Sequence, residues 1–211
     1  MLKIYRPIKT NFLTQGFGEN RNCIKDGVIA NKFIDGTCPA GFVPFYQSVG
    51  LKAHNGEDWL CYKGEPIYHC GEFEGTAKTE IDRSGGIGVD IISKDPFLDG
   101  GNRVKLRYWH LQKVNVFDGQ IIKSGDLIGW GDSTGLSSGD HLHWSLKVVD
   151  WQGNTLNKDN GFYGAIDFRP YFENVFILDV LNVKEQAKTA IQLAREVLLK
   201  VALFLKNYGK K

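Results

Sequence analysis

Long apolar stretches are missing from this sequence of 211 residues. No run of about 18 apolar residues occurs, and the opening stretch MLKIYRPIKTNFLTQGF lacks the apolar core of a secretory signal. We therefore expect neither a transmembrane segment nor an export signal. A strong excess of one charge is missing too, because the formal net charge is +2 and no basic stripe is interleaved with aromatic residues in the body of the chain. A nucleic-acid partner is accordingly not expected.

Cysteine is scarce, with four residues at Cys23, Cys38, Cys61 and Cys70. No Cys-x-x-Cys pair occurs among them, so we do not expect a cysteine-based metal site. Four cysteines allow three disulfide connectivities, and the sequence leaves open whether any disulfide forms. A His-Glu-x-x-His helix motif, which would supply a catalytic glutamate beside a metal, is also missing.

Glycine and phenylalanine, by contrast, are plentiful, with 25 and 13 residues. Together with short alternating runs such as RVKLRYWHL, they favour many short strands joined by tight turns over a helical bundle. The chain is long enough for one well-buried domain, and we expect a mainly β fold of mostly antiparallel sheet. We assign this domain to residues 1–178 and interpret residues 19–50, rich in Gly, Pro and Asn, as an irregular surface insertion within it.

The composition changes after about residue 178, where helix formers replace glycines. Residues 179–211 are predicted to form an amphipathic basic helix, with seven Lys/Arg against two Asp/Glu from residue 184 onward. The apolar face of this helix must be buried against a partner. The partner would be its own domain, a second copy of the chain, another protein or an anionic surface. The apolar residues of this face follow a heptad spacing, widened by Leu193, Val197 and Phe204: Ala187, Ile191, Ala194, Leu198, Val201, Leu205 and Tyr208.

Two histidines stand one residue apart in the segment GDHLHWSLK at residues 139–147. In a strand, His141 and His143 share one face while Leu142 and Trp144 share the other. Two neighbouring imidazoles either bind a metal together, or bind it with one ring and move protons with the other.

The segment HNGED offers partners for this histidine pair. In an extended strand, His54 and Asp58 lie on one face, and Gly56 between them leaves room for a close approach. These two side chains and one imidazole of the histidine pair would hold zinc with three protein ligands and leave a fourth position for water, as catalytic zinc sites require. The other imidazole of the pair and His110 are then the titratable groups suited to proton transfer. The arrangement predicts a hydrolase.

These motifs resemble those of the lysostaphin-type (LytM-like) zinc endopeptidases, which cleave peptide cross-links of bacterial peptidoglycan. The family pattern is His-x-Gly-x-Asp, then aromatic-x-His-Leu, then a glycine-rich turn before Ser-x-Gly-x-His-Leu-His-aromatic. This sequence has HNGED at 54–58, YWHL at 108–111 and GDLIGWGDSTGLSSGDHLHW at 125–144, in that order. With LTQGFG near the start, the similarity covers roughly residues 8–148.

The resemblance implies a compact antiparallel β-sheet sandwich with one Zn²⁺ in a groove. It implies that the metal ligands are His54, Asp58 and His143, and that His110 and His141 are catalytic residues that do not bind the metal. It also implies that the substrate is a peptidoglycan peptide, while the bond cleaved and the identity of the formal base stay open.

Three positions depart from the family pattern. Trp109 replaces a small residue and is expected to narrow or re-line the groove, Asp140 replaces proline and is expected to contact a catalytic histidine, and Ser145 replaces glutamate. The insertion is a candidate groove wall, and Tyr46 within it is a weak candidate for stabilising an oxyanion. His69 belongs to no motif, and we interpret it as a strand-face or surface histidine.

The sequence thus predicts a zinc-dependent peptidoglycan endopeptidase acting at the cell wall. The alternative is a non-catalytic protein of the same fold that binds cell wall or a partner, or takes part in an assembly through its C-terminal helix. The missing export signal would be explained if the chain were a phage lysin or a virion-borne peptidase.

Overall fold

One mainly antiparallel sheet of ten strands dominates the computed structural model, which describes residues 1–97 and 101–208. The mainly β prediction, with a C-terminal helix, is confirmed. The sheet runs β11-β8-β9-β10-β13-β6-β2; off this path, β12 pairs with β10 and β7, and β14 pairs with β13. Its strands are β2 (Leu13–Gln15), β6 (Glu57–Leu60), β7 (Pro66–Tyr68), β8 (Gly75–Asp82), β9 (Gly86–Ser93), β10 (Arg103–Val114), β11 (Ile121–Ile122), β12 (Leu127–Gly131), β13 (His141–Val149) and β14 (Ala165–Ile166).

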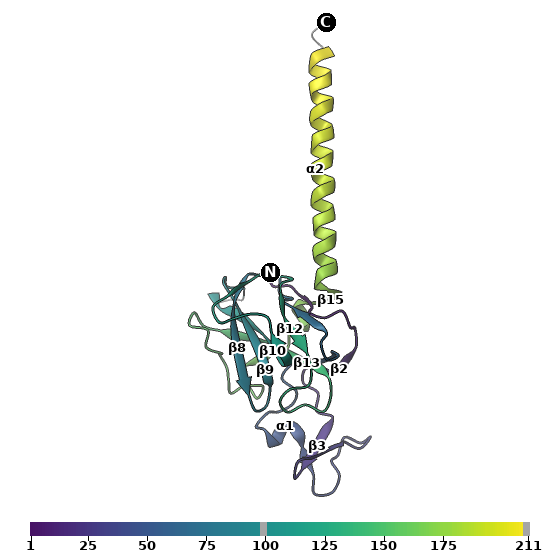
Figure 1. Ribbon diagram of the computed structural model, residues 1–211. Coiled ribbons are helices and arrows are strands. Elements are labelled where there is room, and N and C mark those ends of the chain that lie inside the picture. Colours follow the sequence, from purple (N-terminus) through teal and green to yellow (C-terminus); the bar gives the residue numbers. More distant parts are fainter. Residues whose placement is uncertain (98–100, 209–211) are drawn as a thin grey trace.

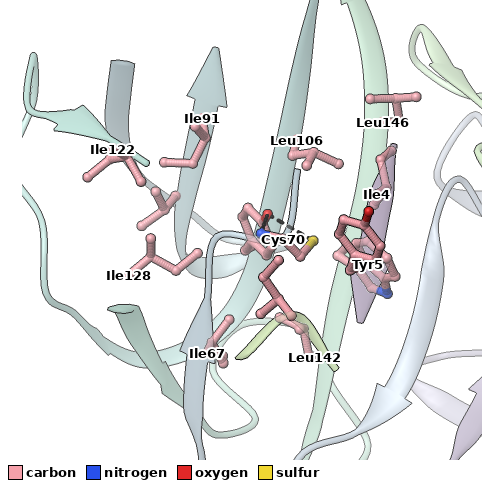
Figure 2. Close-up of a cluster of buried hydrophobic side chains, with 14 of the residues drawn as sticks. Ile4, Tyr5, Ile67, Cys70, Ile91, Leu106, Ile122, Ile128, Leu142 and Leu146 are labelled. Carbon is pink, nitrogen blue, oxygen red and sulfur yellow. Dashed lines mark hydrogen bonds between the residues drawn. The ribbon is translucent and has the colours of Figure 1, made fainter. Parts of the chain in front are cut away.

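The central strands β10 and β13 have two opposed faces of different chemistry. One face carries fully buried apolar side chains that form the main core with residues of neighbouring strands (Figure 2). The parallel pair β1 (Ile4–Arg6) and β15 (Phe172–Phe176), with the 3₁₀ helix η2 (Arg169–Tyr171) before β15, adds further core side chains. The other face carries polar and charged side chains over the same length. Core residues of β10 and β13 are Val104, Leu106, Tyr108, Leu142, Trp144 and Leu146.

His69 lies in this core and not at the surface, so the surface alternative for this residue is wrong. Its Nε2–H donates to the Phe73 carbonyl oxygen at 3.1 Å, because a carbonyl can only accept. The bare Nδ1 then accepts from the Tyr108 hydroxyl at 3.2 Å, and that oxygen accepts from the Cys70 N–H at 3.2 Å. Burial lowers the pKa of His69 to about 4, so the ring is neutral in the folded protein.

The insertion at residues 19–50 is ordered, so the prediction of an irregular segment was wrong. It forms a three-stranded sheet from β3 (Asn22–Lys25), β4 (Val28–Asn31) and β5 (Val43–Pro44), followed by the short helix α1 (Phe45–Ser48). A disulfide joins Cys23 to Cys38, while Cys61 and Cys70 are buried free thiols. A segment with few buried side chains is thus fixed by a covalent cross-link and by backbone pairing.

Helix α2 (Ile177–Tyr208) begins two residues before the predicted boundary and projects from the domain at the end opposite α1 and β3 (Figure 1). Its first turn packs on the core through Ile177, Leu178 and Leu181, and Lys184 pairs with Glu72. Beyond that point the side chains are exposed as far as residue 203, so packing of this face onto its own domain was a wrong expectation. Side chains of Phe204, Leu205 and Tyr208 lie outside the described part. Self-association, docking and the division at residue 178 stay predictions.

Within residues 1–97 and 101–208, the structure has no helix with the length and apolar character needed to cross a bilayer.

Folding stability should decline between pH 6.5 and pH 4 because of His69. The folded-state pKa is about 4 and the ordinary value is 6.5, so in this window the unfolded chain binds the proton and the folded chain does not. The stability is complete above pH 6.5 and is lost as the pH falls toward 4, by about 2 kcal/mol between pH 7 and pH 5. Urea unfolding of the parent and of His69→Gln at pH 7 and pH 5 measures this loss of stability. Equal pH slopes in the two proteins would contradict the assignment.

Candidate functional site

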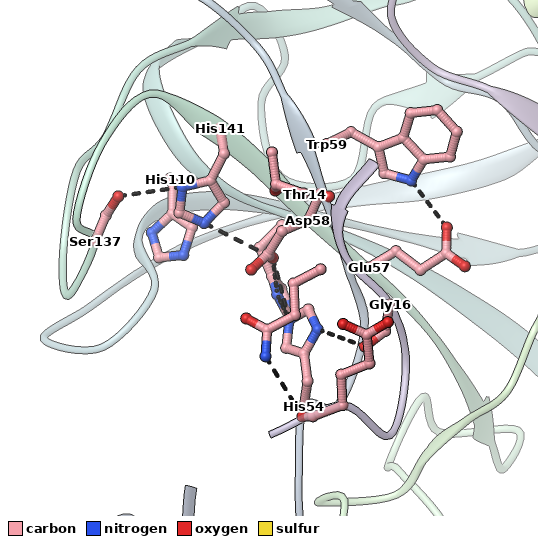
Figure 3. A network of polar contacts seen from close by, with 12 residues as sticks. Thr14, Gly16, His54, Glu57, Asp58, Trp59, His110, Ser137 and His141 are labelled. Carbon is pink, nitrogen blue, oxygen red and sulfur yellow. Dashed lines mark hydrogen bonds and ion pairs between the residues drawn. The ribbon is translucent and has the colours of Figure 1, made fainter. Parts of the chain in front are cut away.

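Two strands and the segment before β6 bring the three predicted ligands together. Asp58 in β6 stands directly opposite His143 in β13, and His54 lies three residues before β6 begins. His54 Nε2 is 3.0 Å from His143 Nδ1 and 3.1 Å from Asp58 Oδ1, and His143 Nδ1 is 2.9 Å from the same oxygen. His54 is therefore not on the strand, as the extended-strand argument assumed, yet it reaches the same point. Figure 3 shows His54 and Asp58 converging, with His141 and His110 beside them.

Gly56 makes this convergence possible, as the sequence predicted. A Cβ at residue 56 would stand 2.5 Å from the Trp144 carbonyl oxygen and 2.7 Å from His143 Cε1. Only a glycine allows the segment from His54 to Asp58 to pass this close to β13.

Backbone carbonyls fix the tautomers of three site histidines. The Nδ1–H groups of His54, His110 and His141 donate to the carbonyl oxygens of Gly16, Thr134 and Gly139, at 3.1, 2.7 and 2.8 Å. A carbonyl oxygen only accepts, so each neutral ring keeps its proton on Nδ1 and has a bare lone pair on Nε2. Hydrogen bonds of this kind are typical of histidines that bind metals.

The donor set fits a zinc ion. His54 Nε2, His143 Nδ1 and Asp58 Oδ1 form a triangle with sides of 2.9–3.1 Å, and the ligand atoms of tetrahedral zinc stand about 3.3 Å apart at bond lengths of about 2.0–2.1 Å. Three lone pairs at this separation repel one another unless a proton or a cation lies between them. Two imidazoles and one carboxylate are a ligand set that suits zinc.

The electrostatics of the triangle favour a cation. Burial lowers the pKa of His54, but the charge of Asp58 and the hydrogen bonds with Asp58 and Gly16 together outweigh it and raise that pKa above its usual value. Burial opposes ionisation of Asp58, yet the charge of His54 and the hydrogen bond with His143 hold the Asp58 pKa well below its ordinary range. Burial lowers the pKa of His143 to about 4. A carboxylate anion beside a neutral imidazole is the protonation state that metal binding requires.

The two remaining histidines lie next to the triangle. The His110 and His141 rings are 4.6 Å apart between centroids, and His110 is 6.1 Å from the His143 ring. His141 Nε2 lies 3.7 Å from Asp58 Oδ1. Burial, aided by the charge of His141, lowers the pKa of His110. Two imidazoles with bare Nε2 atoms thus face the place where the three ligand atoms converge.

His110 reaches this position only because β10 contains a bulge. In a regular strand His110 would share the core face with Tyr108. The pairing of β10 with β9 changes register between Tyr108 and Leu111, and His110 has a φ of +65°. Trp109 and His110 therefore both face the groove, which is the effect of one extra residue in a strand.

All five predicted site residues line one groove of about 720 Å³. The insertion contributes one wall, as the sequence suggested, and Tyr46 in that wall has its ring 5.5 Å from the His54 ring and donates its hydroxyl to Gln15. Sequence spacing gave little weight to Tyr46, because only the fold of the insertion brings it beside a ligand. The wall residues from the insertion are Asn22, Ile29, Phe45, Tyr46 and Val49.

The departures from the motif pattern have different structural outcomes. Trp109 lines the groove, with the Arg107 guanidinium 5.0 Å from its ring centre. The Asp140 carboxylate accepts from the Lys63 N–H at 3.0 Å, and no contact with a catalytic histidine is seen among the described residues. The expectation for Asp140 was therefore wrong.

Comparison with known proteins identifies the family. The family model described as Peptidase family M23 matches residues 52–158, a span that holds all five site residues. The chain belongs to Peptidase family M23. The motif-based resemblance to lysostaphin-type peptidases is thereby confirmed.

Two curated relatives and one solved structure are similar to parts of this chain. Glycyl-glycine endopeptidase ALE-1 of Staphylococcus capitis is 29% identical over 54% of this chain and 30% of its own length. Peptidoglycan DD-endopeptidase ShyB of Vibrio cholerae is 30% identical over 50% of this chain and 23% of its own length. The solved catalytic domain of lysostaphin from Staphylococcus simulans is 27% identical, with 57% of this chain and 79% of that chain covered at a TM-score of 0.45. The chain spans less than a third of the two curated relatives.

Gly56→Ala should disrupt the metal site. The added Cβ pushes on β13 at Trp144 and His143, so we expect a loss of about 1–3 kcal/mol in unfolding free energy and at least about tenfold weaker zinc binding. Competition with a fluorescent chelator measures the zinc affinity, and thermal unfolding measures the loss of stability. Gly139→Ala is the matched control, because a Cβ there meets nothing within 4 Å. Zinc affinity of Gly56→Ala equal to that of the control would refute the close-approach argument.

Proposed function

We propose that this protein is a zinc-dependent endopeptidase that hydrolyses peptide bonds in the stems or cross-bridges of bacterial peptidoglycan. The observation that carries the proposal is the combination, in one groove, of a three-atom donor set with two further imidazoles whose Nε2 atoms are bare. A closed structural zinc site would use a fourth protein ligand, whereas this set leaves a position for water and substrate.

His54, Asp58 and His143 would hold the zinc ion. When bound, zinc supplies a Lewis acid for the scissile carbonyl and lowers the pKa of water. His141 and His110 stand ready at Nε2 to accept the proton of the attacking water and to return it to the leaving amine. The Thr134 and Gly139 carbonyls keep both rings in the orientation that this proton transfer needs. His110, whose pKa is lowered, is neutral at neutral pH and so can accept a proton.

The name of the Vibrio cholerae relative supports peptidoglycan as the substrate, and with it the cell wall as the place of action. One relative is named for a glycyl-glycine bond and the other for a DD bond, so the bond that this chain cuts is left open. We propose that the chain is itself a phage lysin or a virion-borne peptidase, which would explain how it reaches the cell wall.

A binding protein without catalysis is the alternative on the same fold. A non-catalytic protein of this fold would be expected to lack a metal ligand or a proton-transfer group. This chain keeps the three proposed ligands and both further histidines. No observation among the described residues favours it.

Digestion of purified peptidoglycans with different cross-bridges tests the proposal. We expect new amine termini, seen by mass spectrometry, that disappear with a chelator and with His143→Ala, because both changes remove the metal. Restored cleavage on adding zinc to the chelated enzyme is the positive control. If the protein binds one equivalent of zinc but cleaves no cross-bridge, the endopeptidase proposal fails and the binding alternative takes its place.

His110→Asn should separate catalysis from metal binding. Asn tolerates a positive φ, so the bulge is kept while the proton-transfer group is lost. We expect kcat to fall by about 10²- to 10⁴-fold with one zinc still bound. His69→Gln, which loses a histidine outside the groove, should keep kcat near the parent value. A kcat for His110→Asn within a few fold of the parent would remove His110 from the mechanism.

A further inference from the structure

The polar face of the sheet continues beyond the metal site as two rows of paired side chains. In the pairing of β10 with β13, Trp109 stands opposite His143, Arg107 opposite Ser145, and Lys105 opposite Lys147. All of these residues line the same groove. Because residues two apart in a strand share a face, the groove floor passes from the metal ligand to a group of three basic side chains.

One buried carboxylate only partly balances these cations. Asp90 accepts two hydrogen bonds from Arg107, at 2.7 and 2.8 Å, and pairs with Lys105 at 3.1 Å. Lys147 has no carboxylate partner among the described residues, and its Nζ donates to the Tyr163 carbonyl at 2.9 Å. Burial, together with the charges of Arg107 and Lys105, lowers the pKa of Lys147 to about 7. Arg107 and Lys105 outnumber the one carboxylate of Asp90, and Lys147 adds to this excess of positive charge in its protonated form.

Ser145 gives a second, independent indication of a ligand. Its side chain is 1% exposed and lines the groove, and its Oγ has no hydrogen-bond partner. A buried hydroxyl without a partner costs free energy. An anion placed between Arg107 and Lys147 would accept a hydrogen bond from this hydroxyl and also meet the unbalanced charge.

We propose that Ser145, Lys147 and Arg107 form a subsite that binds a carboxylate of the peptide substrate and so selects acidic peptides. This inference rests on the proposed function. The rest of the groove lining agrees with it, because the described lining has five basic side chains and only two acidic ones, of which Asp58 is a metal ligand: Lys78, Lys105, Arg107, Lys147, Lys158, Asp58 and Asp82.

The position of the subsite predicts where the carboxylate lies in the substrate. Ser145 and Lys147 stand two and four residues along β13 from His143, which is about 7 and 13 Å at the rise of a strand. An extended peptide has a similar rise per residue, so the carboxylate is expected two to four residues from the scissile bond.

Three synthetic peptides that span the bond identified by the digestion test the subsite. The first is neutral, with Gln two to four residues from the bond and an amidated C-terminus. The second replaces this Gln by Glu, and the third has Gln with a free C-terminal carboxylate. We expect the zinc-loaded full chain to prefer the second or the third over the first by about tenfold in kcat/KM, through KM, since a remote contact contributes uniform binding.

Lys147→Met should abolish this preference, so that the acidic peptides are cleaved with no higher kcat/KM than the neutral one. The substitution leaves both partners of Asp90 in place, so folding is expected to persist, and Ser145→Ala should reduce the preference with still less disturbance. Lys78→Met is the matched control, because Lys78 lines the same groove but pairs with Glu80. It should keep the preference.

Calorimetry makes the test independent of cleavage. It measures the affinity of the protein for acetyl-Ala-Ala-Glu-Ala-Ala-amide, for its Gln counterpart and for the Gln peptide with a free C-terminus. Tighter binding of either acidic peptide that is lost in Lys147→Met supports the subsite even if no bond is cut, in which case the proposed function alone fails. Equal binding and equal kcat/KM for all three peptides, or a preference that survives in Lys147→Met, would overturn the subsite and leave the endopeptidase proposal intact.

Discussion

The repulsion among three lone pairs is the constraint on which the site depends. In the deprotonated state that binds a metal, His54, Asp58 and His143 present three acceptor atoms within 3.1 Å of one another. This arrangement is unfavourable without a positive charge at its centre. The protein nevertheless holds it in place, with a carbonyl that fixes the His54 tautomer and a glycine that allows close approach of two segments. The hydrogen bond to Gly16 and the close approach at Gly56 thus hold the three ligand atoms together.

The same strands that build the hydrophobic core also build the groove floor. Alternation along β13 places Leu142, Trp144 and Leu146 in the core, and places both histidines, Ser145 and Lys147 on the opposite face. A strand fixed by a well-packed core positions its polar face with little freedom, because interiors are densely packed. Precision at the metal thus derives from apolar packing on the other side of one sheet.

Short-range periodicity predicted the parts of the site that lie on regular strands. His141 and His143 share a face, as the alternation in GDHLHWSLK implied. His110 could not be placed this way, because the bulge in β10 reverses its direction and local sequence does not reveal a register change between distant strands. The ordered insertion was missed for a similar reason, since its stability comes from a cross-link whose pairing the sequence left open. For α2, periodicity predicted the helix but not what covers it.

The Cys23–Cys38 disulfide has a consequence for where the groove takes its full shape. The bond joins β3 to the segment before β5 in the small sheet, which contributes Asn22 and Ile29 to one groove wall, and α1 with Tyr46 follows β5 directly. The three proposed ligands, His54, Asp58 and His143, lie outside the segment between the two cysteines. A chain folded in a reducing compartment would keep the chemistry of the centre but lose a covalent constraint on that wall. The redox potential of the surroundings therefore acts on the fit of the substrate and not on the reacting groups.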